Sequence, residues 1–417
     1  MSHHHKKRPS TVERLREFSV PLLAGVVVAM IVANINFDAY EHLVHSPFAA
    51  ILGGGHGAVE ATTGAELHAS PWDHYTTLHF LVNDLFMVLF FGVAAKEITE
   101  ACLPGGALNP PKKAINPLLG TLGGVLGPAF LYILLNKMMG EPAWQRGWGI
   151  PTATDIALAW LAARFIFGKA HPAVSFLLLL AVADDGIGLG IIAFAYPDAN
   201  HPTQWSQALW ILPGMAIAFA LRAAKVRSWI PYIALGGAFS WWGLFNAHLH
   251  PALALVFIVP FLPGPRRDLG MFEDKKDESH LSTLEQFEHD VKAFVDFGLF
   301  FFAFANAGVP LAGITNLTWI VLLALVLGKI LGISTFSFVG QKLGFPLPTG
   351  MTTGHLIVAS AVAGMGLTVA LFVSGQAFTD GAMQGAAKMG ALFSVVAAPV
   401  AFALRQLLLA KTPPAHE

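Results

Sequence analysis

Two adjacent aspartates, Asp184 and Asp185, lie in the middle of the apolar stretch of residues 172–195. About 20 apolar residues are enough for a helix to cross a bilayer, so this stretch is predicted to be a membrane span. Ionisable side chains at that depth are costly, and they usually face the interior of a helix bundle or a water-filled path. The pair therefore predicts a functional site that needs negative charge inside the membrane.

A carboxylate pair of this kind suits competition between a metal cation and protons. Hard cations such as Na⁺ take oxygen ligands, which carboxylates, backbone carbonyls and Thr hydroxyls supply. Two acids side by side resist double ionisation, so the cation and the protons compete for the same oxygens. A site that opens alternately to the two sides of the membrane exchanges them without a chemical reaction. We therefore predict a transporter rather than an enzyme, with Asp184 and Asp185 as ligands of transported Na⁺ and with no cofactor.

A third buried charge is predicted at Lys329, in the middle of another apolar stretch, residues 316–339. The side chain is far from both ends of the span, so it needs a carboxylate partner or must lose its proton. Successive residues on a helix point about 100° apart, so the two aspartates can serve different partners. Two interpretations stay open: a permanent bridge between helices, and a bridge that exists only while the aspartate is ionised.

The composition is that of a polytopic membrane protein. The 417 residues are 55% hydrophobic and 12% charged, whereas an ordinary soluble domain is about 25% charged. The net charge of −1 argues against nucleic acid as a partner, and the lipid bilayer is the expected one. Cys102 is the only cysteine, which excludes an intrachain disulfide. The first apolar stretch is interpreted as a retained span rather than a signal peptide, because many more spans follow it.

The hydropathy pattern predicts an all-α fold of about twelve transmembrane helices in one domain, residues 18–408. Short tails, residues 1–17 and 409–417, flank this domain. The predicted spans are residues 18–35, 76–99, 113–137, 149–166, 172–195, 204–222, 227–244, 248–263, 290–310, 316–339, 353–377 and 384–408.

The distribution of Lys and Arg predicts which side each loop faces, because basic residues concentrate on the cytoplasmic side. With the N-terminus inside, all but four of the 25 Lys and Arg residues lie on that side. The exceptions are Lys137, Arg146 and Lys388 on the outer side and Lys329 in the membrane. An even number of spans then predicts that both termini are cytoplasmic. Residues 36–75, which contain no Lys or Arg, are the predicted external excursion, and residues 264–290 are a predicted cytoplasmic loop.

Two stretches inside the predicted spans are not typical of a continuous helix. Residues 149–155 open the fourth span with a proline and two hydroxyl residues, and residues 363–368 interrupt the eleventh span with Gly364 and Gly366. Non-helical backbone at membrane depth is tolerated only where it is buried in protein or lines a cavity. Both stretches are therefore predicted to support the ion site.

Paired interruptions in two halves of a chain mark the substrate site in several transporter families built on inverted repeats. We therefore predict inverted repeats near residues 113–195 and 316–408. Broken helices leave partial charges at their ends, positive at an N-terminus and negative at a C-terminus. Asp155 is predicted to neutralise the former and Lys329 the latter.

Five short motifs in these spans occur in a characteristic order. They are Gly-Ile-Pro-Thr-Ala-Thr-Asp-Ile-Ala (149–157), Leu-Ala-Val-Ala-Asp-Asp-Gly (180–186), Phe-Ala-Phe-Ala-Asn-Ala-Gly (302–308), Gly-Lys-Ile-Leu-Gly (328–332) and Gly-Met-Gly-Leu-Thr (364–368). Their order and spacing resemble the NhaA-type sodium/proton antiporter family over roughly residues 18–408. That family is itself known for inverted repeats and broken helices, so the interruptions and the resemblance are not independent observations.

The resemblance implies twelve spans with broken, crossing fourth and eleventh helices, in a homodimer in the bacterial inner membrane. It also implies export of Na⁺ or Li⁺ in exchange for periplasmic protons, with net charge moving inward and roles in pH homeostasis and salt tolerance. Asp185 matches the principal ion-binding carboxylate, and Asp184 matches its neighbour, which pairs with the lysine matching Lys329. Asp155 matches the aspartate that compensates helix dipoles, with Thr154 beside it.

Three more positions match family residues at a distance from the aspartate pair. Glu97 matches an acid at the cytoplasmic funnel, Asp84 matches another acid in the second span, and His250 matches a histidine linked to pH response. A second funnel acid is replaced by Ala101, and Glu100 lies one residue earlier, which leaves the pH dependence open. An interfacial histidine with a solvated ring is an equal alternative for His250.

The external excursion includes residues 53–57, where the family forms a dimerising hairpin, but this glycine-rich sequence makes a strand uncertain.

Three other classes of membrane protein fit the sequence less well than the antiporter. A sodium-coupled symporter needs a roomy polar pocket for an organic anion. In such a symporter, Lys329 has no obvious role. An intramembrane aspartyl protease would use Asp155 with Asp184 or Asp185, but a lysine would hold an aspartate ionised when the acid pair must share a proton. A channel needs a ring of charges, which adjacent acids on one helix do not make without oligomeric symmetry.

Overall fold

The computed structural model describes residues 19–48, 73–104, 106, 108–109, 111–169, 171–197, 202–265 and 281–409 of the chain. All elements in these ranges are helical, apart from an isolated bridge between Pro47 and Thr77. The all-α prediction is confirmed for this part of the chain. The predicted hairpin at residues 53–57, residues 266–280 of the predicted cytoplasmic loop, and residues 1–17 and 410–417 of the predicted tails lie outside the described residues.

The helices follow one another along the chain with short connections. Those of the first half are α2 (Val20–Ile35), α3 (Phe37–His45), η1 (Asp73–Thr76), α5 (Leu78–Phe80), η2 (Leu81–Phe86), α6 (Met87–Cys102), α7 (Pro111–Met139), η3 (Pro142–Thr152), α8 (Ile156–Phe167), α9 (Pro172–Ala195), α10 (Trp205–Ala208) and α11 (Ile211–Ala223). Those of the second half are η4 (Tyr232–Gly237), α12 (Ala238–Asn246), η5 (Pro251–Phe257), η6 (Val259–Phe261), α13 (Thr283–Ala307), η8 (Leu311–Gly313), α14 (Asn316–Leu323), η9 (Ala324–Gly328), α15 (Lys329–Lys342), α16 (Thr353–Val362), α17 (Thr368–Ala377), α18 (Gly381–Phe393), η10 (Ser394–Val396) and α19 (Ala397–Leu409).

Six helical stretches among the described residues are long and apolar enough to cross a bilayer, and the bent pair of η3 and α8 makes a seventh. The shorter apolar helices are α2, the stretch Pro251–Phe261, α16 and α17. The chain is thus a multi-pass membrane protein, while the count of twelve spans stays a prediction.

Two predicted spans are less regular than expected. Residues 248–263 form the 3₁₀-helices η5 and η6, and residues 227–244 begin with the π-helix η4. Pro260, inside η6, has no N–H to donate and its ring crowds the carbonyl four residues earlier, so the α-helical hydrogen bond is lost at this point. Hydropathy predicts the apolar segment but not its hydrogen-bond pattern.

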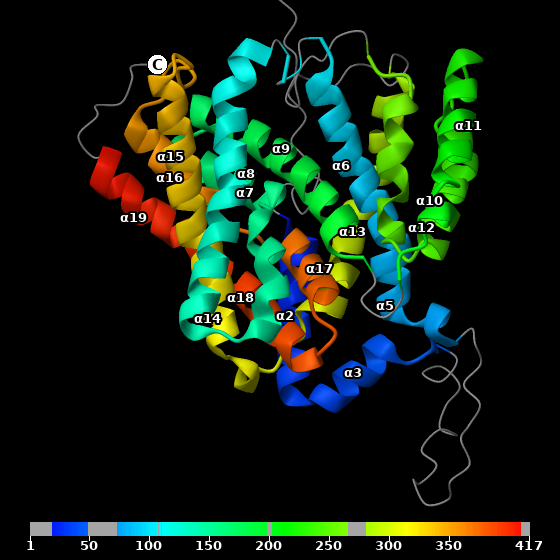
Figure 1. Ribbon diagram of the computed structural model, residues 1–417, viewed down its shortest axis with the longest axis horizontal. Coiled ribbons are helices and arrows are strands. Elements are labelled where there is room, and N and C mark those ends of the chain that lie inside the picture. The colour runs from blue at the N-terminus through cyan, green and yellow to red at the C-terminus, as the bar shows by residue number, and fades with distance from the viewer. Residues whose placement is uncertain are drawn as a thin grey trace, which may run out of the picture.

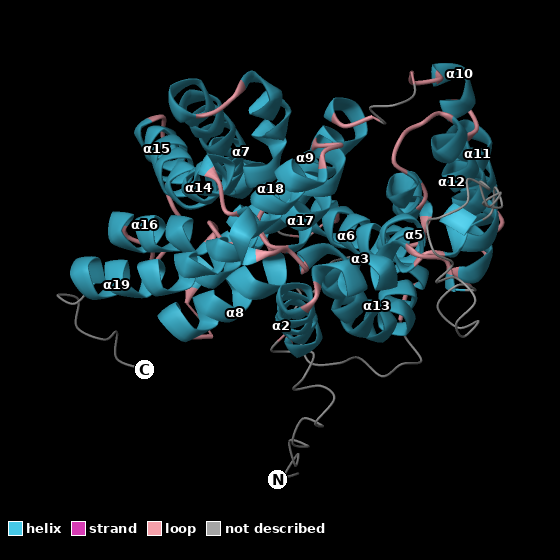
Figure 2. Cartoon of the chain, turned by 90° about the horizontal axis from the view of Figure 1, so that it is seen from below, coloured by secondary structure: helices cyan, strands magenta, loops and turns pink. Residues whose placement is uncertain are grey.

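α7 and α15 pack backbone against backbone, side by side in Figure 2. A Cβ atom added at Gly332 would lie 2.0 Å from the carbonyl oxygen of Gly123, and one added at Gly123 would lie 2.2 Å from that of Gly332. Glycine lets membrane helices approach this closely. A Cβ atom added at Gly124 would lie 3.6 Å from Nζ of Lys329, so this close packing buries the lysine between the two helices.

Side chains fix the starts of the helices that surround the site. Asp155 caps α8, His171 caps α9 through Nδ1, and Thr352 caps α16 in a capping box with His355. These caps satisfy backbone N–H groups that a helix start leaves unpaired.

The arrangement places short, interrupted helices in the middle of the bundle. In Figure 2, α17 lies near the centre, with α11 and α12 at one edge and α19 at the other. In Figure 1, α3 lies across the bottom of the bundle, at an angle to the long helices. Tyr40 of α3 donates a hydrogen bond from its hydroxyl to the carbonyl of Phe304 on α13 and accepts one from the N–H of Gly308. The described part of the predicted external excursion is therefore anchored to the end of α13.

Candidate functional site

Two helix breaks face each other at the centre of the molecule. The first joins η3 to α8 through residues 153–155, with a bend of 56° between the two helices. The second joins α16 to α17 through residues 363–367. A Cβ atom added at Gly366 would lie 2.8 Å from the carbonyl oxygen of Ala153, so the two breaks touch. A Cβ atom added at Gly364 would lie 3.1 Å from Cα of Val326, so the second break also packs against η9.

Asp155 stabilises both breaks with one carboxylate. Its Oδ1 accepts a hydrogen bond from the backbone N–H of Leu158 in α8 at 3.0 Å. Its Oδ2 accepts hydrogen bonds from the N–H and the hydroxyl of Thr368, the first residue of α17, at 3.2 and 3.0 Å. The carboxylate is buried and lies at the N-terminal, positive ends of two half-helices. It therefore joins the halves that the two breaks separate.

Lys329 and Asp184 form an ion pair beside the first break. Both side chains are fully buried, with 0% of their surface exposed. Nζ of Lys329 donates to Oδ2 of Asp184 and to the carbonyl of Thr152, the last residue of η3. The lysine thus neutralises both a carboxylate and the negative C-terminal end of a half-helix.

Thr154 connects the ion pair to the second break. Its hydroxyl lies 2.8 Å from Oδ2 of Asp184 and 3.0 Å from the carbonyl oxygen of Ala363, and it can donate to either. The carbonyl of Ala363 belongs to the C-terminal end of α16, where the helix leaves its carbonyls unpaired. A change at Asp184 therefore reaches the second break through one hydroxyl group.

Asp185 is buried next to Asp184 on α9, and each carboxylate has an oxygen that the protein does not satisfy. The Oδ1 atoms of Asp184 and Asp185 are buried and have no hydrogen-bond partner among the residues that the structure describes. A narrow, mostly apolar pocket lies beside Asp185, lined by Phe91 and Ala94 of α6, Leu189 and Ile192 of α9, and Val369 of α17. Among the described residues no three His, Cys, Asp or Glu side chains come together to hold a metal. The free carboxylate oxygens and the hydroxyl of Thr154 are hard oxygen donors, of the kind that hard cations take.

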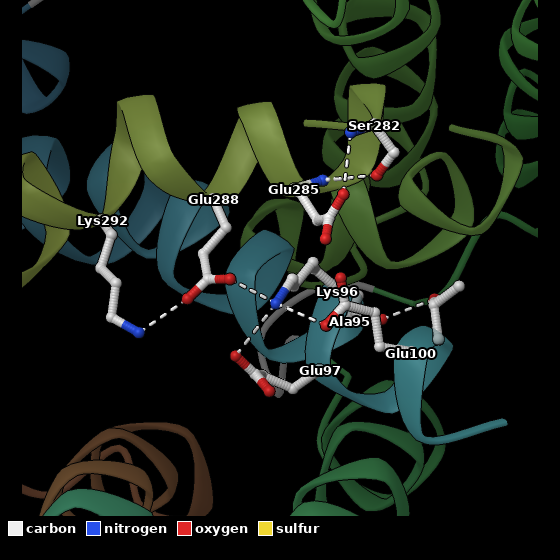
Figure 3. Close-up of polar contacts among 9 residues, drawn as sticks. Ala95, Lys96, Glu97, Glu100, Ser282, Glu285, Glu288 and Lys292 are labelled. Atoms are coloured by element: carbon white, nitrogen blue, oxygen red, sulfur yellow. Dashed lines mark hydrogen bonds and ion pairs between the residues drawn. The ribbon is translucent and has the colours of Figure 1, made fainter. Parts of the chain in front are cut away.

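Glu97 lies in a separate group of charges at the end of α6, shown in Figure 3. Nζ of Lys96 lies 2.7 Å from Oε2 of Glu100 and 3.5 Å from Oε1 of Glu97, and it also pairs with Glu288 of α13. Glu288 in turn accepts from Lys292 at 2.6 Å. Lys96 is only 4% exposed, so this group ties α6 to α13 through a buried ammonium.

Lys96 and Glu288 give only a weak signal in the sequence. Lys96–Glu100 and Glu288–Lys292 each have the i, i+4 spacing of a helical ion pair. That spacing is the signal that a sequence offers for such a group. It does not predict that the two pairs meet.

Asp84 and His250 lie outside the crossing of the two breaks. Asp84 is in the π-helix η2, and its backbone carbonyl accepts a hydrogen bond from Nε1 of Trp241 at 3.1 Å. His250 caps η5, accepting the N–H of Ala252, and its ring centroid lies 4.6 Å from that of Phe372 on α17. The structure thus brings together Thr154, Asp155, Asp184, Asp185, Lys329, Gly364 and Gly366, while Asp84, Glu97 and His250 sit elsewhere.

Relatives match almost the whole chain. The family described as Na+/H+ antiporter 1 matches residues 11–405. A Geobacter metallireducens protein named Na(+)/H(+) antiporter NhaA is 54% identical over 404 residues, covering 97% of this chain and 99% of that protein. A Desulfitobacterium hafniense protein of the same name is 55% identical over 399 residues, covering 95% of this chain and 96% of its own length. One from Jannaschia sp. is 39% identical over 418 residues, covering 94% of this chain and 96% of its own.

Proposed function

Because the chain belongs to the NhaA-type sodium/proton antiporter family, we propose that it exports Na⁺ or Li⁺ and takes up protons through Asp184 and Asp185. The cation and the protons compete for the two carboxylates, and the site opens alternately to the two sides of the membrane. The exchange moves net charge inward. The protein works as a homodimer of twelve-span subunits in the bacterial inner membrane, with both termini in the cytoplasm.

The carboxyl oxygens without a protein partner support this competition. The Oδ1 atoms of Asp184 and Asp185 are buried acceptors, and both a cation and a proton satisfy such an oxygen. A protonated carboxyl group loses a ligand position, so the proton and the cation exclude each other. The hydroxyl of Thr154, within reach of Asp184, adds an oxygen from the first break.

The buried pair of Lys329 with Asp184 is the observation that carries the proposal. An ammonium without exposure to water needs an anionic partner, and Asp184 supplies it. While no metal ion is bound, Lys329 balances the charge of Asp184. When a cation enters beside Asp185, the charge of Lys329 opposes it, and release of protons from the site offsets that repulsion. The lysine thereby couples cation binding to proton release.

The geometry favours antiport over two of the alternatives. An aspartyl protease would need Asp155 to share a proton with another aspartate, but both of its oxygens already accept hydrogen bonds from α8 and α17. A symporter for an organic anion would need a roomy polar pocket, whereas the pocket beside Asp185 is narrow and mostly apolar.

Everted membrane vesicles test the function. A pH gradient imposed on vesicles that carry the protein should dissipate on addition of Na⁺ or Li⁺, with K⁺ as the comparison ion. Asp185→Asn should abolish the response, because it removes a charged ligand at nearly constant shape. The matched control is Asp380→Asn, which changes an exposed aspartate that caps α18 and keeps a capping oxygen.

The two possible failures have different meanings. A gradient that survives Na⁺ and Li⁺ at every pH with the unaltered protein would overturn antiport itself. Dissipation at the normal rate by Asp185→Asn would instead overturn the assignment of the site.

A further inference from the structure

A serine from outside the crossing contacts the second helix break. Ser394 is fully buried at the junction of α18 and α19, where the 3₁₀-turn η10 joins the two helices. Its hydroxyl donates to the carbonyl of Ala391 at 2.6 Å and accepts a hydrogen bond from the N–H of Gly366 at 3.2 Å. The last predicted span thus reaches into the break of the span before it.

The 3₁₀-turn that begins at Ser394 has a local cause. Pro399 has no N–H, so the carbonyl of Val395 cannot receive the usual α-helical hydrogen bond. The tighter 3₁₀-turn at residues 394–396 is a common adjustment beside such a defect. The hydroxyl of Ser394 also donates to the carbonyl of Ala391, a local side-chain bond that competes with the regular α-helical pattern.

The contact holds one end of a single peptide group. The carbonyl of Met365 and the N–H of Gly366 belong to the same planar unit, in which they point in opposite directions. The carbonyl end accepts the N–H of Asp155 at 2.7 Å, and the N–H end donates to Ser394. The peptide plane is therefore clamped between the fourth predicted span on one side and the twelfth on the other.

Glycine makes this clamp necessary. Gly366 is not restrained by a side chain, and glycine reaches backbone conformations closed to other residues, so an unclamped 365–366 peptide can rotate at low cost. No larger residue fits to restrain it, because a Cβ atom added at Gly366 would lie 2.8 Å from the carbonyl of Ala153 and 2.6 Å from Leu325. A hydrogen bond from a neighbouring helix is the restraint that remains.

We propose that Ser394 is a positioning residue for ion exchange: it fixes the 365–366 peptide and thereby the second break against Thr154 and Asp155. The inference rests on the proposed function. Two residues before the clamped peptide, the carbonyl of Ala363 competes with Asp184 for the hydroxyl of Thr154. Movement of the second break alters that competition, and it therefore changes which oxygens are available to a cation. Ser394 sets cation affinity without touching the ion.

A matched pair of serine substitutions separates this role from simple packing. Ser394→Ala removes the acceptor of the Gly366 N–H. Ser374→Ala removes a hydroxyl of equal size that is also fully buried, but which donates only to Ala370 within its own helix α17. Ser394→Cys keeps a weak acceptor at nearly the same shape.

The readout is the apparent KM for Na⁺ and Li⁺ in everted vesicles, measured with the maximal rate across pH. We expect Ser394→Ala to raise the apparent KM about tenfold, a change that one lost buried hydrogen bond supports, with the maximal rate within about twofold of normal. Ser394→Cys should fall between Ser394→Ala and the unaltered protein, and Ser374→Ala should match the latter. If Ser394→Ala fails to fold, the comparison of Ser394→Cys with Ser374→Ala carries the test.

Hydrogen–deuterium exchange gives a second readout that does not depend on transport. Ser394→Ala should speed exchange of the peptide covering residues 363–368, whereas Ser374→Ala should leave it unchanged. An unchanged KM together with unchanged hydrogen exchange in Ser394→Ala would overturn the proposal that Ser394 fixes the 365–366 peptide. Equal effects of Ser394→Ala and Ser374→Ala would also overturn it. Absence of antiport in the unaltered protein would overturn the proposed function instead, and the exchange measurement would still decide whether Ser394 holds the break.

Discussion

Replacing Lys329 by methionine should expose how strongly the site depends on its buried ion pair. The substitution removes the positive charge at nearly constant length, so it leaves little cavity. Nζ of Lys329 is the partner of Asp184 and also donates to the carbonyl of Thr152, and both charged side chains are 0% exposed. Breaking a buried pair by removing one partner costs about 3–5 kcal/mol, because it leaves an uncompensated charge. We expect Lys329→Met to lower the free energy of unfolding by about that amount.

A second substitution should restore most of the loss. In Lys329→Met/Asp184→Asn the remaining partner is neutral, and its amide oxygen still accepts the hydroxyl of Thr154. Replacement of a whole buried pair by uncharged groups is often close to neutral. Either single substitution leaves one buried charge unpaired and the double substitution leaves neither, so the double-mutant cycle should give a coupling energy of at least about 3 kcal/mol between the two positions, while all of these variants lose antiport.

The assay is unfolding of the purified protein in detergent, followed for the four proteins of the cycle under identical conditions. Lys342→Met is the control, because Lys342 is an exposed lysine at the other end of α15, and its loss should change stability by no more than about 0.5 kcal/mol. Lys329→Met with the stability of the unaltered protein, or strict additivity in the double variant, would contradict the assignment of Lys329 as the obligatory partner of Asp184.

Two further predictions concern a helix cap and a helix contact. His171 caps α9 through Nδ1, and burial and the neighbouring His355 lower its pKa, so the neutral form is favoured in the folded protein. The stability that this cap contributes is complete above the ordinary histidine pKa of about 6.5 and is lost as the pH falls towards the lowered pKa. His171→Asn keeps a capping side chain but does not titrate. We therefore expect the melting temperature of this variant to fall less on acidification than that of the unaltered protein. An equal dependence of the melting temperature on pH in the two proteins would refute this. Gly332→Ala should abolish formation of folded protein, because the new Cβ would lie 2.0 Å from a backbone carbonyl oxygen. Gly375→Ala is the control and should fold, because its Cβ would meet no described atom within 4 Å. Comparable yields of the two variants on size-exclusion chromatography would contradict the close packing of α7 and α15.

The charged centre of the site could be predicted because charges are rare in membrane spans. Asp184, Asp185 and Lys329 each interrupt an apolar stretch, and burial of a charge demands a reason. How these three side chains pair with one another is harder to predict from the sequence. Whether Lys329 meets Asp184 or Asp185 depends on the rotation of α9 relative to α15, which no single apolar stretch specifies. That pairing came from the family resemblance, and the structure contains it.

The interruptions were visible in the sequence, but the form of the backbone around them was not. Proline and glycine predicted breaks at residues 149–155 and 363–368, and helices end at both places. The segment before the first break is a 3₁₀-helix that begins at Pro142, earlier than the predicted span. Hydropathy measures how apolar a segment is, and it carries no information on whether its hydrogen bonds are 3₁₀, α or π.

Residues that act through tertiary contacts left the weakest signal. Ser394 is one serine in an apolar helix, and its contact with Gly366 depends on how this helix packs against the second break. Lys96 forms a helical pair with Glu100 that spacing predicts, but its contact with Glu288 depends on how α6 packs against α13. Such residues become visible when two distant segments are placed side by side, which is what a sequence without structure does not provide.

Competition between the cation and protons at the aspartate pair can be measured without transport. Calorimetric titration of the purified protein with Na⁺, in two buffers with different enthalpies of ionisation, reports how many protons leave the site when the cation binds. We expect Na⁺ binding to release protons over the pH range in which the protein is active, and both binding and release to vanish in Asp185→Asn. Na⁺ binding with the same heat in both buffers at every pH would mean that no protons are released and would contradict the exchange mechanism.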